Sequence, residues 1–247
     1  MGSPLPDASY SLRNWGPWTV VSLDDWDQFE VGQSTAVELA CDSGFQNPDR
    51  RLQFYSLLPV RSVHEADQVH GDGLFDVPAH SSGLLQCDGL TTARSGVMLT
   101  MRTADCYPVF IRDVDSHRFG LVHAGWRGLR DKIVLKALEE WFDGPVSVLV
   151  GAGIAPESYE VSGDVISEVA RTHDVSTKAL KARNILSDEH LDLPRLIRWQ
   201  CRLSRRSINS FKVLGLSTGE HQPVPMYSYR ETSTDERLIS WIFKTSC

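Results

Sequence analysis

The chain has 247 residues, which is enough for one large domain or two small ones. Hydrophobic residues make up 41% of the sequence and aromatic residues 9%, so we predict a packed core and not a disordered chain. The net charge is −7 and the basic residues are scattered, so we expect no nucleic-acid partner and no membrane partner. No apolar run approaches the roughly 20 residues needed to cross a bilayer.

The cysteines indicate a reducing compartment. Their spacings are wide, and no Cys-x-x-Cys pair occurs among Cys41, Cys87, Cys106, Cys201 and Cys247. An odd number of cysteines with such spacing is typical of reduced thiols and not of a disulfide framework. Residues 1–7 carry neither a basic cluster nor an apolar stretch, so they do not resemble a signal peptide. We therefore expect a cytoplasmic protein.

The first predicted elements lie between residues 97 and 123, whereas residues 1–50 show the least pattern and yield no predicted element. Residues 97–101 form a short apolar run that predicts a buried strand. Pro108 discourages regular structure just before it, so Cys106 is expected in a turn or at the start of a helix. Residues 119–123 predict a second strand, which ends on His123.

A glycine-flanked turn at residues 125–128 follows this strand. Apolar residues at imperfect helical spacing then predict a helix from Leu129 to Trp141, and Asp143-Gly144-Pro145 stops it. The remaining predicted elements are strands at 146–150, 211–216 and 238–243 and helices at 163–173 and 194–207. Because strands and helices are interspersed, we predict an α+β fold class, a mixed α and β domain.

Three short segments each contain a potential ligand for a soft metal ion. They are residues 68–71 with His70, residues 103–106 with Cys106, and residues 122–128 with His123. Two imidazoles and one thiolate suit zinc, which takes four ligands, and they leave one position open. Three protein ligands with an open position are typical of a catalytic site, whereas four usually indicate a structural one.

Each of these side chains also has an ordinary structural explanation. A histidine in a glycine loop, such as His70, is more often a surface or hydrogen-bonded residue, and a lone Cys106 is by default a small buried hydrophobe. His123 at a strand end could be satisfied by the backbone. All three, however, lie beside strand ends and glycine turns, where sites tend to be placed on a rigid scaffold. Their combination favours a metal site, with a spacing less specific than that of a zinc finger.

Longer stretches around these residues resemble a known family. The stretches are "QVHG" (68–71), "DGLTT" (88–92), "TADCYPV" (103–109), "VHAGWRG" (122–128) and "GAGIAPESYEV" (151–161). Together they are similar to the laccase-domain, or multicopper polyphenol oxidoreductase-like, family, and the match is specific between His70 and Val161. Members of that family are regarded as zinc-dependent purine nucleoside phosphorylases with adenosine deaminase activity.

The resemblance implies a metal site, a fold and a reaction. By correspondence with the family's metal ligands, His70, Cys106 and His123 would hold the metal and form the catalytic centre. The implied fold is a mixed-sheet layered α/β sandwich, similar to cytotoxic necrotizing factor, with residues 1–247 as a single laccase-like domain. The implied partners are small purine nucleosides and phosphate. Adenosine or inosine plus phosphate would yield the base and ribose 1-phosphate, with adenosine deamination as a side activity.

Four further residues are candidates for binding substrate or phosphate. Arg127 lies in a turn that leads to a helix N-terminus, where backbone N–H groups favour phosphate. Asp105 could act as an acid or base beside the metal, orient a ligand, or simply form a turn. Arg50 is the nearest equivalent of an arginine that the family carries ahead of "QVHG". Arg230 stands in "YSYRE" (227–231), where the family has a second arginine and this chain has an acid.

Three other functions remain open. A copper-dependent polyphenol oxidase would use the same three ligands, but the eight histidines include none of the His-x-His pairs of multicopper oxidases. A cysteine hydrolase or transferase would use Cys106 as nucleophile and His123 as base. In a non-catalytic binding protein, zinc on the same three residues would stabilise the fold and no reaction would take place. The other histidines are expected to be surface or turn residues: His64, His80, His117, His173, His190 and His221.

Overall fold

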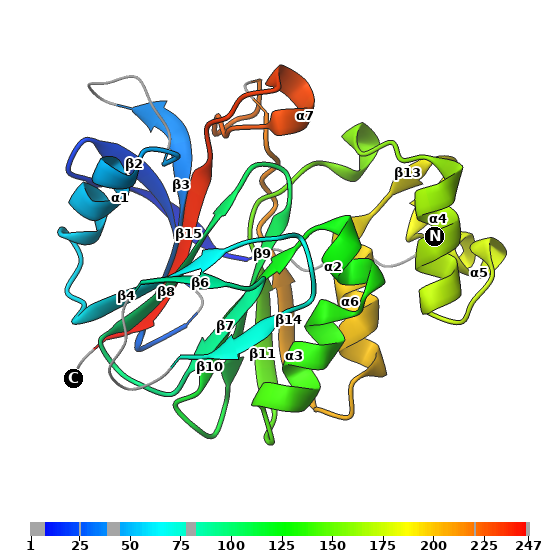
Figure 1. Ribbon diagram of the computed structural model, residues 1–247, viewed down its shortest axis with the longest axis horizontal. Coiled ribbons are helices and arrows are strands. Elements are labelled where there is room, and N and C mark those ends of the chain that lie inside the picture. The colour runs from blue at the N-terminus through cyan, green and yellow to red at the C-terminus, as the bar shows by residue number, and fades with distance from the viewer. Residues whose placement is uncertain (1–7, 25, 39–44, 78–82, 220, 246–247) are drawn as a thin grey trace.

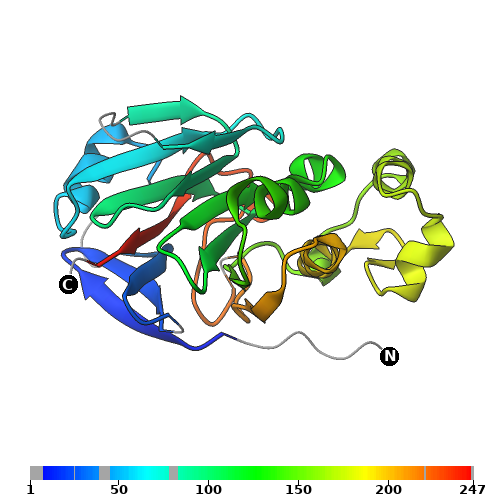
Figure 2. The same ribbon diagram turned by 90° about the horizontal axis from the view of Figure 1, so that it is seen from below.

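A computed structural model describes residues 8–24, 26–38, 45–77, 83–219 and 221–245. Within these residues the chain forms two large mixed sheets with helices on their outer faces. Figure 2 shows the sheets stacked face to face, with the longer helices gathered beyond one of them. The prediction of a mixed-sheet layered α/β sandwich is confirmed. No helix in the described ranges is long and apolar enough to cross a membrane.

The first sheet has the strand order β1-β2-β3-β15-β8-β4-β6 in the described part of the chain. Its strands are β1 (Tyr10–Trp15), β2 (Trp18–Leu23), β3 (Phe29–Glu38), β15 (Leu238–Lys244), β8 (Val97–Thr103), β4 (Ser62–Asp67) and β6 (Gly83–Gln86). β4 pairs parallel with both of its neighbours, and the other pairs are antiparallel. The C-terminal strand β15 lies between β3 and β8 and so joins the N-terminal strands to the rest of the sheet (Figure 1).

The second sheet has the order β14-β11-β9-β10-β7-β5. Its strands are β14 (Ile208–Val213), β11 (Val146–Val150), β9 (Tyr107–Asp113), β10 (Phe119–Ala124), β7 (Gly89–Thr92) and β5 (Leu74–Asp76). A separate two-stranded ribbon pairs β12 (Leu186–Ser187) with β13 (His190–Leu191). The helices are α1 (Pro48–Tyr55), α2 (Trp126–Arg130), α3 (Ile133–Trp141), a 3-10 turn at Pro156–Ser158, α4 (Gly163–Thr172), α5 (Thr177–Ala182), α6 (Leu193–Leu203) and α7 (Tyr229–Thr232).

Strand β9 shows why the central strands are continuous apolar runs in the sequence. Successive side chains of a strand point to opposite faces, so a strand covered on both faces is apolar throughout. Val109 and Ile111 pack into a core shared with α3, α4 and α6, whereas Phe110 between them packs into the core between the two sheets. A third cluster, which includes Trp18, Phe54 and Trp241, fills the space between the first sheet and α1.

The predicted strands at 97–101, 119–123, 146–150 and 238–243 and the helix at 163–173 are confirmed. Residues 125–128 are not a turn, because α2 already begins at Trp126. The single helix predicted from Leu129 to Trp141 is wrong: the chain leaves α2 at Asp131, and Lys132, with φ +62°, separates it from α3. A left-handed residue cannot continue a right-handed helix.

Three further expectations need correction. The predicted helix at 194–207 ends at Leu203, because Ser204 adopts an extended backbone. The strand predicted at 211–216 is β14, which begins earlier and ends at Val213. Residues 1–50, for which no element was predicted, contain β1, β2 and β3.

Two histidines expected on the surface or in turns are buried. His64 is 0% exposed and lies in β4, and His173 is 7% exposed and caps α4. His80 lies outside the described residues. Histidine has an apolar ring body that packs well in a core, so its sequence context alone did not distinguish these sites from surface ones.

Candidate metal centre

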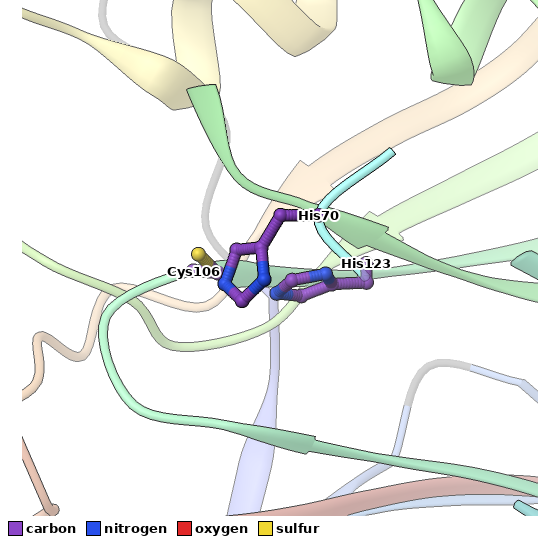
Figure 3. A group of neighbouring side chains, drawn as sticks. All are labelled: His70, Cys106 and His123. Carbon is purple, nitrogen blue, oxygen red and sulfur yellow. The ribbon is translucent and has the colours of Figure 1, made fainter. Parts of the chain in front are cut away.

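Three loops or strand ends bring the predicted ligands together (Figure 3). His70 follows β4, Cys106 lies in the turn between β8 and β9, and His123 lies near the end of β10. One potential ligand atom from each residue lies within 4.8 Å of the other two. The imidazole centroids of His70 and His123 are 4.9 Å apart, with the rings nearly perpendicular. No second group of three such side chains occurs in the part of the chain that the structure describes.

The carboxylate of Asp88 holds two of these segments in place. Its Oδ1 accepts the backbone N–H of His70 at 3.0 Å and lies 2.8 Å from Nδ1 of His123. Its Oδ2 accepts the N–H of Gly71 at 2.8 Å. A carboxylate beside Nδ1 keeps the proton on that nitrogen and leaves Nε2 as the lone-pair donor, which is the arrangement of metal-bound histidines.

Asp88 received no role from the sequence, although it opens the "DGLTT" stretch. It is fully buried, and burial would raise the pKa of its carboxyl, but hydrogen bonds from His123 and Gly71 lower the pKa overall. The available signal was an aspartate placed just before a glycine inside a family stretch. This signal points to a role in the site only when the hydrogen bond of the carboxylate to His123 is known.

Backbone conformation at the site is unusual in two places. His70 has φ +60° and Asp105 has φ +88°, a region that side-chain-bearing residues rarely adopt and that clusters at functional sites. Gly125, just after β10, allows the thiol to approach, because a Cβ there would lie 2.8 Å from Sγ of Cys106. The loops that carry His70 and Cys106 therefore adopt a strained backbone that brings the two side chains close together.

The thiol and the buried imidazole form a charge pair. Burial, the largest single influence, raises the pKa of Cys106, but the charge of His123 and hydrogen bonds from His123 and His70 together lower it to about 6. Burial likewise lowers the pKa of His123, and the charge of Cys106 and the hydrogen bond to Asp88 raise it to about 9. The thiolate is therefore the stable form at neutral pH, and thiolates are both metal ligands and nucleophiles.

The three side chains open into a cavity of about 580 Å³. Its lining includes Arg127 and Arg230, which were predicted to bind phosphate, and the aromatic rings of Trp126, Tyr159 and Tyr229. The guanidinium of Arg127 lies 4.6 Å from the Trp126 ring. The guanidinium of Arg230 lies 5.2 Å from the Tyr159 ring and donates to the carbonyl of Glu160 at 3.0 Å. Both arginines are exposed toward solvent.

Asp105 also lines the cavity, but both of its carboxylate oxygens have partners within the chain. Oδ1 accepts the hydroxyl of Thr218 at 2.7 Å, and Oδ2 accepts the backbone N–H of Arg230 at 2.7 Å. Asp105 therefore ties the turn that carries Cys106 to the start of α7, where Arg230 stands. This geometry favours a positioning role over direct acid–base chemistry.

Arg50 is the one candidate that the structure does not bring to the cavity. It lies half-buried in α1 and is absent from the cavity lining. Two arginines that the sequence did not single out, Arg102 and Arg237, line the cavity instead. Arg102 pairs with Glu65 at 3.2 Å, and its backbone N–H donates to Oε1 of Gln68, two residues before His70.

The donor set fits a soft or borderline divalent ion. Two imidazoles and one low-pKa thiolate are typical zinc or copper donors, and the adjoining cavity leaves room for a further ligand. The same thiolate–imidazole pair could also support nucleophilic chemistry without a metal.

Several bacterial proteins are similar to this chain in sequence. A purine nucleoside phosphorylase of Xylella fastidiosa is 28% identical across 97% of this chain and 94% of its own length. One of Pseudomonas aeruginosa is 32% identical across 72% of each chain. One of Deinococcus radiodurans is 32% identical across 62% of this chain, a match that spans 57% of the Deinococcus protein.

Solved structures show the same fold. The Bacillus licheniformis hypothetical protein YfiH has a TM-score of 0.77 at 22% identity, covering 94% of this chain and 98% of its own. YlmD from Geobacillus stearothermophilus has a TM-score of 0.73 at 21% identity, covering 98% of this chain and 100% of its own. The family model described as multi-copper polyphenol oxidoreductase laccase matches residues 20–245. The chain therefore belongs to the multi-copper polyphenol oxidoreductase laccase family.

Proposed function

We propose that this protein is a zinc-dependent purine nucleoside phosphorylase with adenosine deaminase side activity. The observation that carries the proposal is the meeting of His70, Cys106 and His123 within 4.8 Å, at a cavity that also holds arginines. The names of the relatives support a nucleoside and phosphate as substrates. The three ligand residues would hold zinc, which when bound supplies a Lewis acid that polarises an oxygen of water or substrate.

Other side chains of the cavity would bind the phosphate and the purine. Arg127 and Arg230 provide two guanidinium groups, each able to hold a phosphate oxygen pair through charge-assisted hydrogen bonds. Held there, phosphate would attack C1′ of the nucleoside as the glycosidic bond breaks, yielding ribose 1-phosphate and the base. The rings of Tyr159 and Tyr229 provide an apolar wall for a purine. Asp105 keeps Arg230 at the cavity through its backbone N–H.

A specific observation favours one alternative. The lowered pKa of Cys106 and its contact with His123 suit a cysteine nucleophile with a histidine base. In that case activity would persist in metal-free protein, and His70 would have no catalytic task. We prefer the zinc enzyme, because both His70 and His123 place a ring nitrogen within 4.8 Å of the Cys106 thiol, whereas a nucleophile with its base needs only one imidazole.

The test combines elemental analysis with an inosine-plus-phosphate assay on wild type, His123→Ala and His221→Ala. His221 is an exposed histidine outside the cavity and serves as the matched control. We expect about one zinc per chain and release of hypoxanthine from wild type and the control, and loss of both in His123→Ala. Full zinc occupancy in His123→Ala would refute the ligand assignment. Zinc-loaded wild type that releases no base from any purine nucleoside would refute the phosphorylase.

We also propose a cytoplasmic location. The described cysteines Cys87, Cys106 and Cys201 are all free thiols, as expected of a reducing compartment. The proposed substrates are metabolites of that compartment.

A further inference from the structure

A second cavity, of about 410 Å³, lies between α5 and α6. It shares no lining residue with the cavity at the candidate metal centre. Four arginines line it: Arg183 at the end of α5, and Arg195, Arg198 and Arg202 on α6. Such a concentration of positive charge is unexpected in a chain whose net charge is −7.

The spacing of the α6 arginines places them on one side of the helix. Residues 195, 198 and 202 follow at intervals of three and four, which return to the same helix face. At 1.5 Å per residue, the row from Arg195 to Arg202 extends over about 10 Å. The opposite face of α6, with Leu196, Ile197 and Cys201, is buried in the core, so the helix itself is firmly held.

Acidic partners neutralise only one end of this row. Arg195 pairs with Asp192 at 3.0 Å. Within the described residues, neither Arg198 nor Arg202 makes an ion pair or a side-chain hydrogen bond, and the guanidinium of Arg198 lies 5.8 Å from the ring of Phe211. Burial, and then the charges of Arg202 and Arg195, lower the pKa of Arg198. The guanidinium groups of Arg198 and Arg202, one turn apart on α6, carry like charges that repel one another. A bound anion would relieve that repulsion.

The aromatic residue of the cavity is already engaged. The ring of Trp199 stacks on that of His173 at 5.0 Å, and the guanidinium of Arg183 lies 5.0 Å from its centroid. The Trp199 indole therefore already packs against two side chains of the protein, and the cavity would recognise a ligand mainly through the charge of its arginines. Guanidinium groups match the oxygen pairs of phosphate groups, and a row of them matches several phosphates in succession.

We propose that the cavity between α5 and α6 is a binding site for an oligophosphate anion, in which Arg198 and Arg202 hold successive phosphate groups. The chemistry is shared by inorganic oligophosphates and by the phosphate chain of a nucleotide. The site is separate from the proposed phosphorylase cavity and does not depend on that activity.

The test is calorimetric titration of the full chain, purified with its metal, with inorganic tripolyphosphate and with ATP in phosphate-free, low-salt buffer. The variant Arg198→Gln/Arg202→Gln removes the proposed contacts. The control Arg171→Gln/Arg205→Gln removes the same charge from two exposed arginines outside the cavity. A third variant, Arg127→Gln/Arg230→Gln, removes the arginines of the metal-centre cavity.

We expect a saturable site, additional to any phosphate binding at the metal-centre cavity, that is weakened at least tenfold in Arg198→Gln/Arg202→Gln and is retained in the other two variants. Equal affinity for tripolyphosphate and ATP would identify the phosphate chain as the whole ligand, whereas tighter binding of ATP would add a nucleotide contact. Absence of saturable binding at millimolar tripolyphosphate and ATP would overturn the proposal. So would wild-type affinity in Arg198→Gln/Arg202→Gln, or binding lost only in Arg127→Gln/Arg230→Gln.

Discussion

Asp88 and His123 form two hydrogen bonds with each other, one through their side chains and one through their backbones. Oδ1 of Asp88 lies 2.8 Å from Nδ1 of the imidazole, and the backbone N–H of His123 donates to the carbonyl of Asp88 at 2.8 Å. Asp88 precedes β7 and His123 lies in β10, which are neighbouring antiparallel strands. The pairing of two strands thus sets the position and the tautomer of one proposed ligand, and the same carboxylate reaches the loop that carries His70.

The first prediction concerns this carboxylate. Asp88→Asn replaces one acceptor oxygen by an NH₂ group facing donors, so we expect zinc affinity to fall by about 10–100-fold. The free energy of unfolding should fall by about 2–3 kcal/mol, because a buried charge-assisted hydrogen bond is lost. Competition with a chromogenic chelator measures the zinc affinity, and urea unfolding measures the free energy of unfolding.

Asp76→Asn, at an exposed carboxylate paired with Arg118, is the control and should change neither quantity by much. Unchanged zinc affinity in Asp88→Asn would show that Asp88 does not orient the ligands.

The second prediction concerns space beside the thiol. In Gly125→Ala the new Cβ would lie 2.8 Å from Sγ of Cys106, so the thiol must shift and zinc affinity should fall about tenfold or more. The backbone of Gly125 has negative φ and accepts alanine, so the effect should come from that contact alone. Gly163→Ala is the matched control, because nothing lies within 4 Å of its Cβ. The control should bind zinc normally and be equally or slightly more stable. Equal zinc affinity in both variants would show that the close approach of Gly125 to Cys106 does not matter for metal binding.

The third prediction concerns the charge state of Cys106. Because its pKa is lowered to about 6, metal-free protein should react with iodoacetamide at a rate that rises with pH and is half-maximal near pH 6. Burial raises the pKa of Cys87 to about 11 and that of Cys201 to about 12, so these thiols should stay unmodified. Peptide mapping by mass spectrometry follows each cysteine separately. His123→Ala should move the midpoint upward, and a midpoint near the ordinary thiol pKa of about 8.5 in wild type would disprove the thiolate–imidazolium pair.

The fourth prediction concerns phosphate. Arg230→Gln removes a guanidinium from the cavity but keeps the backbone N–H that Asp105 accepts, so the fold of α7 should persist. Loss of a charge-assisted hydrogen bond of about 1.5–3 kcal/mol should lower kcat/KM for phosphate by about 10–100-fold. Initial rates at varied phosphate, with inosine saturating, measure this effect. Arg205→Gln, at an arginine whose side chain is 84% exposed, should leave the rate unchanged. A phosphate dependence equal to that of wild type would exclude Arg230 from phosphate binding.

Parts of the fold followed from local pattern. Strands such as β8 and β11 are buried on both faces and contain apolar runs (residues 97–99 and 148–150), so they are recognisable from the sequence alone. The strands of residues 10–38 escaped detection because their pattern is broken by polar residues such as Gln33 and Ser34. Both are fully buried: the side chain of Gln33 bonds the backbone of Ala152, and the hydroxyl of Ser34 accepts the N–H of Ile239. A polar residue is predicted to be exposed until its distant partner is known.

The sequence by itself determined which side chains are candidate ligands and which stretches carry them, because His70, Cys106 and His123 stand near strand ends within family motifs. Only the tertiary structure decided which other residues accompany them. It placed Asp88 behind His123, turned Asp105 toward Thr218 and Arg230, and left Arg50 away from the cavity. The reason is physical: side-chain identity is local, whereas a hydrogen bond between residues 113 or 125 positions apart depends on the packing of both sheets.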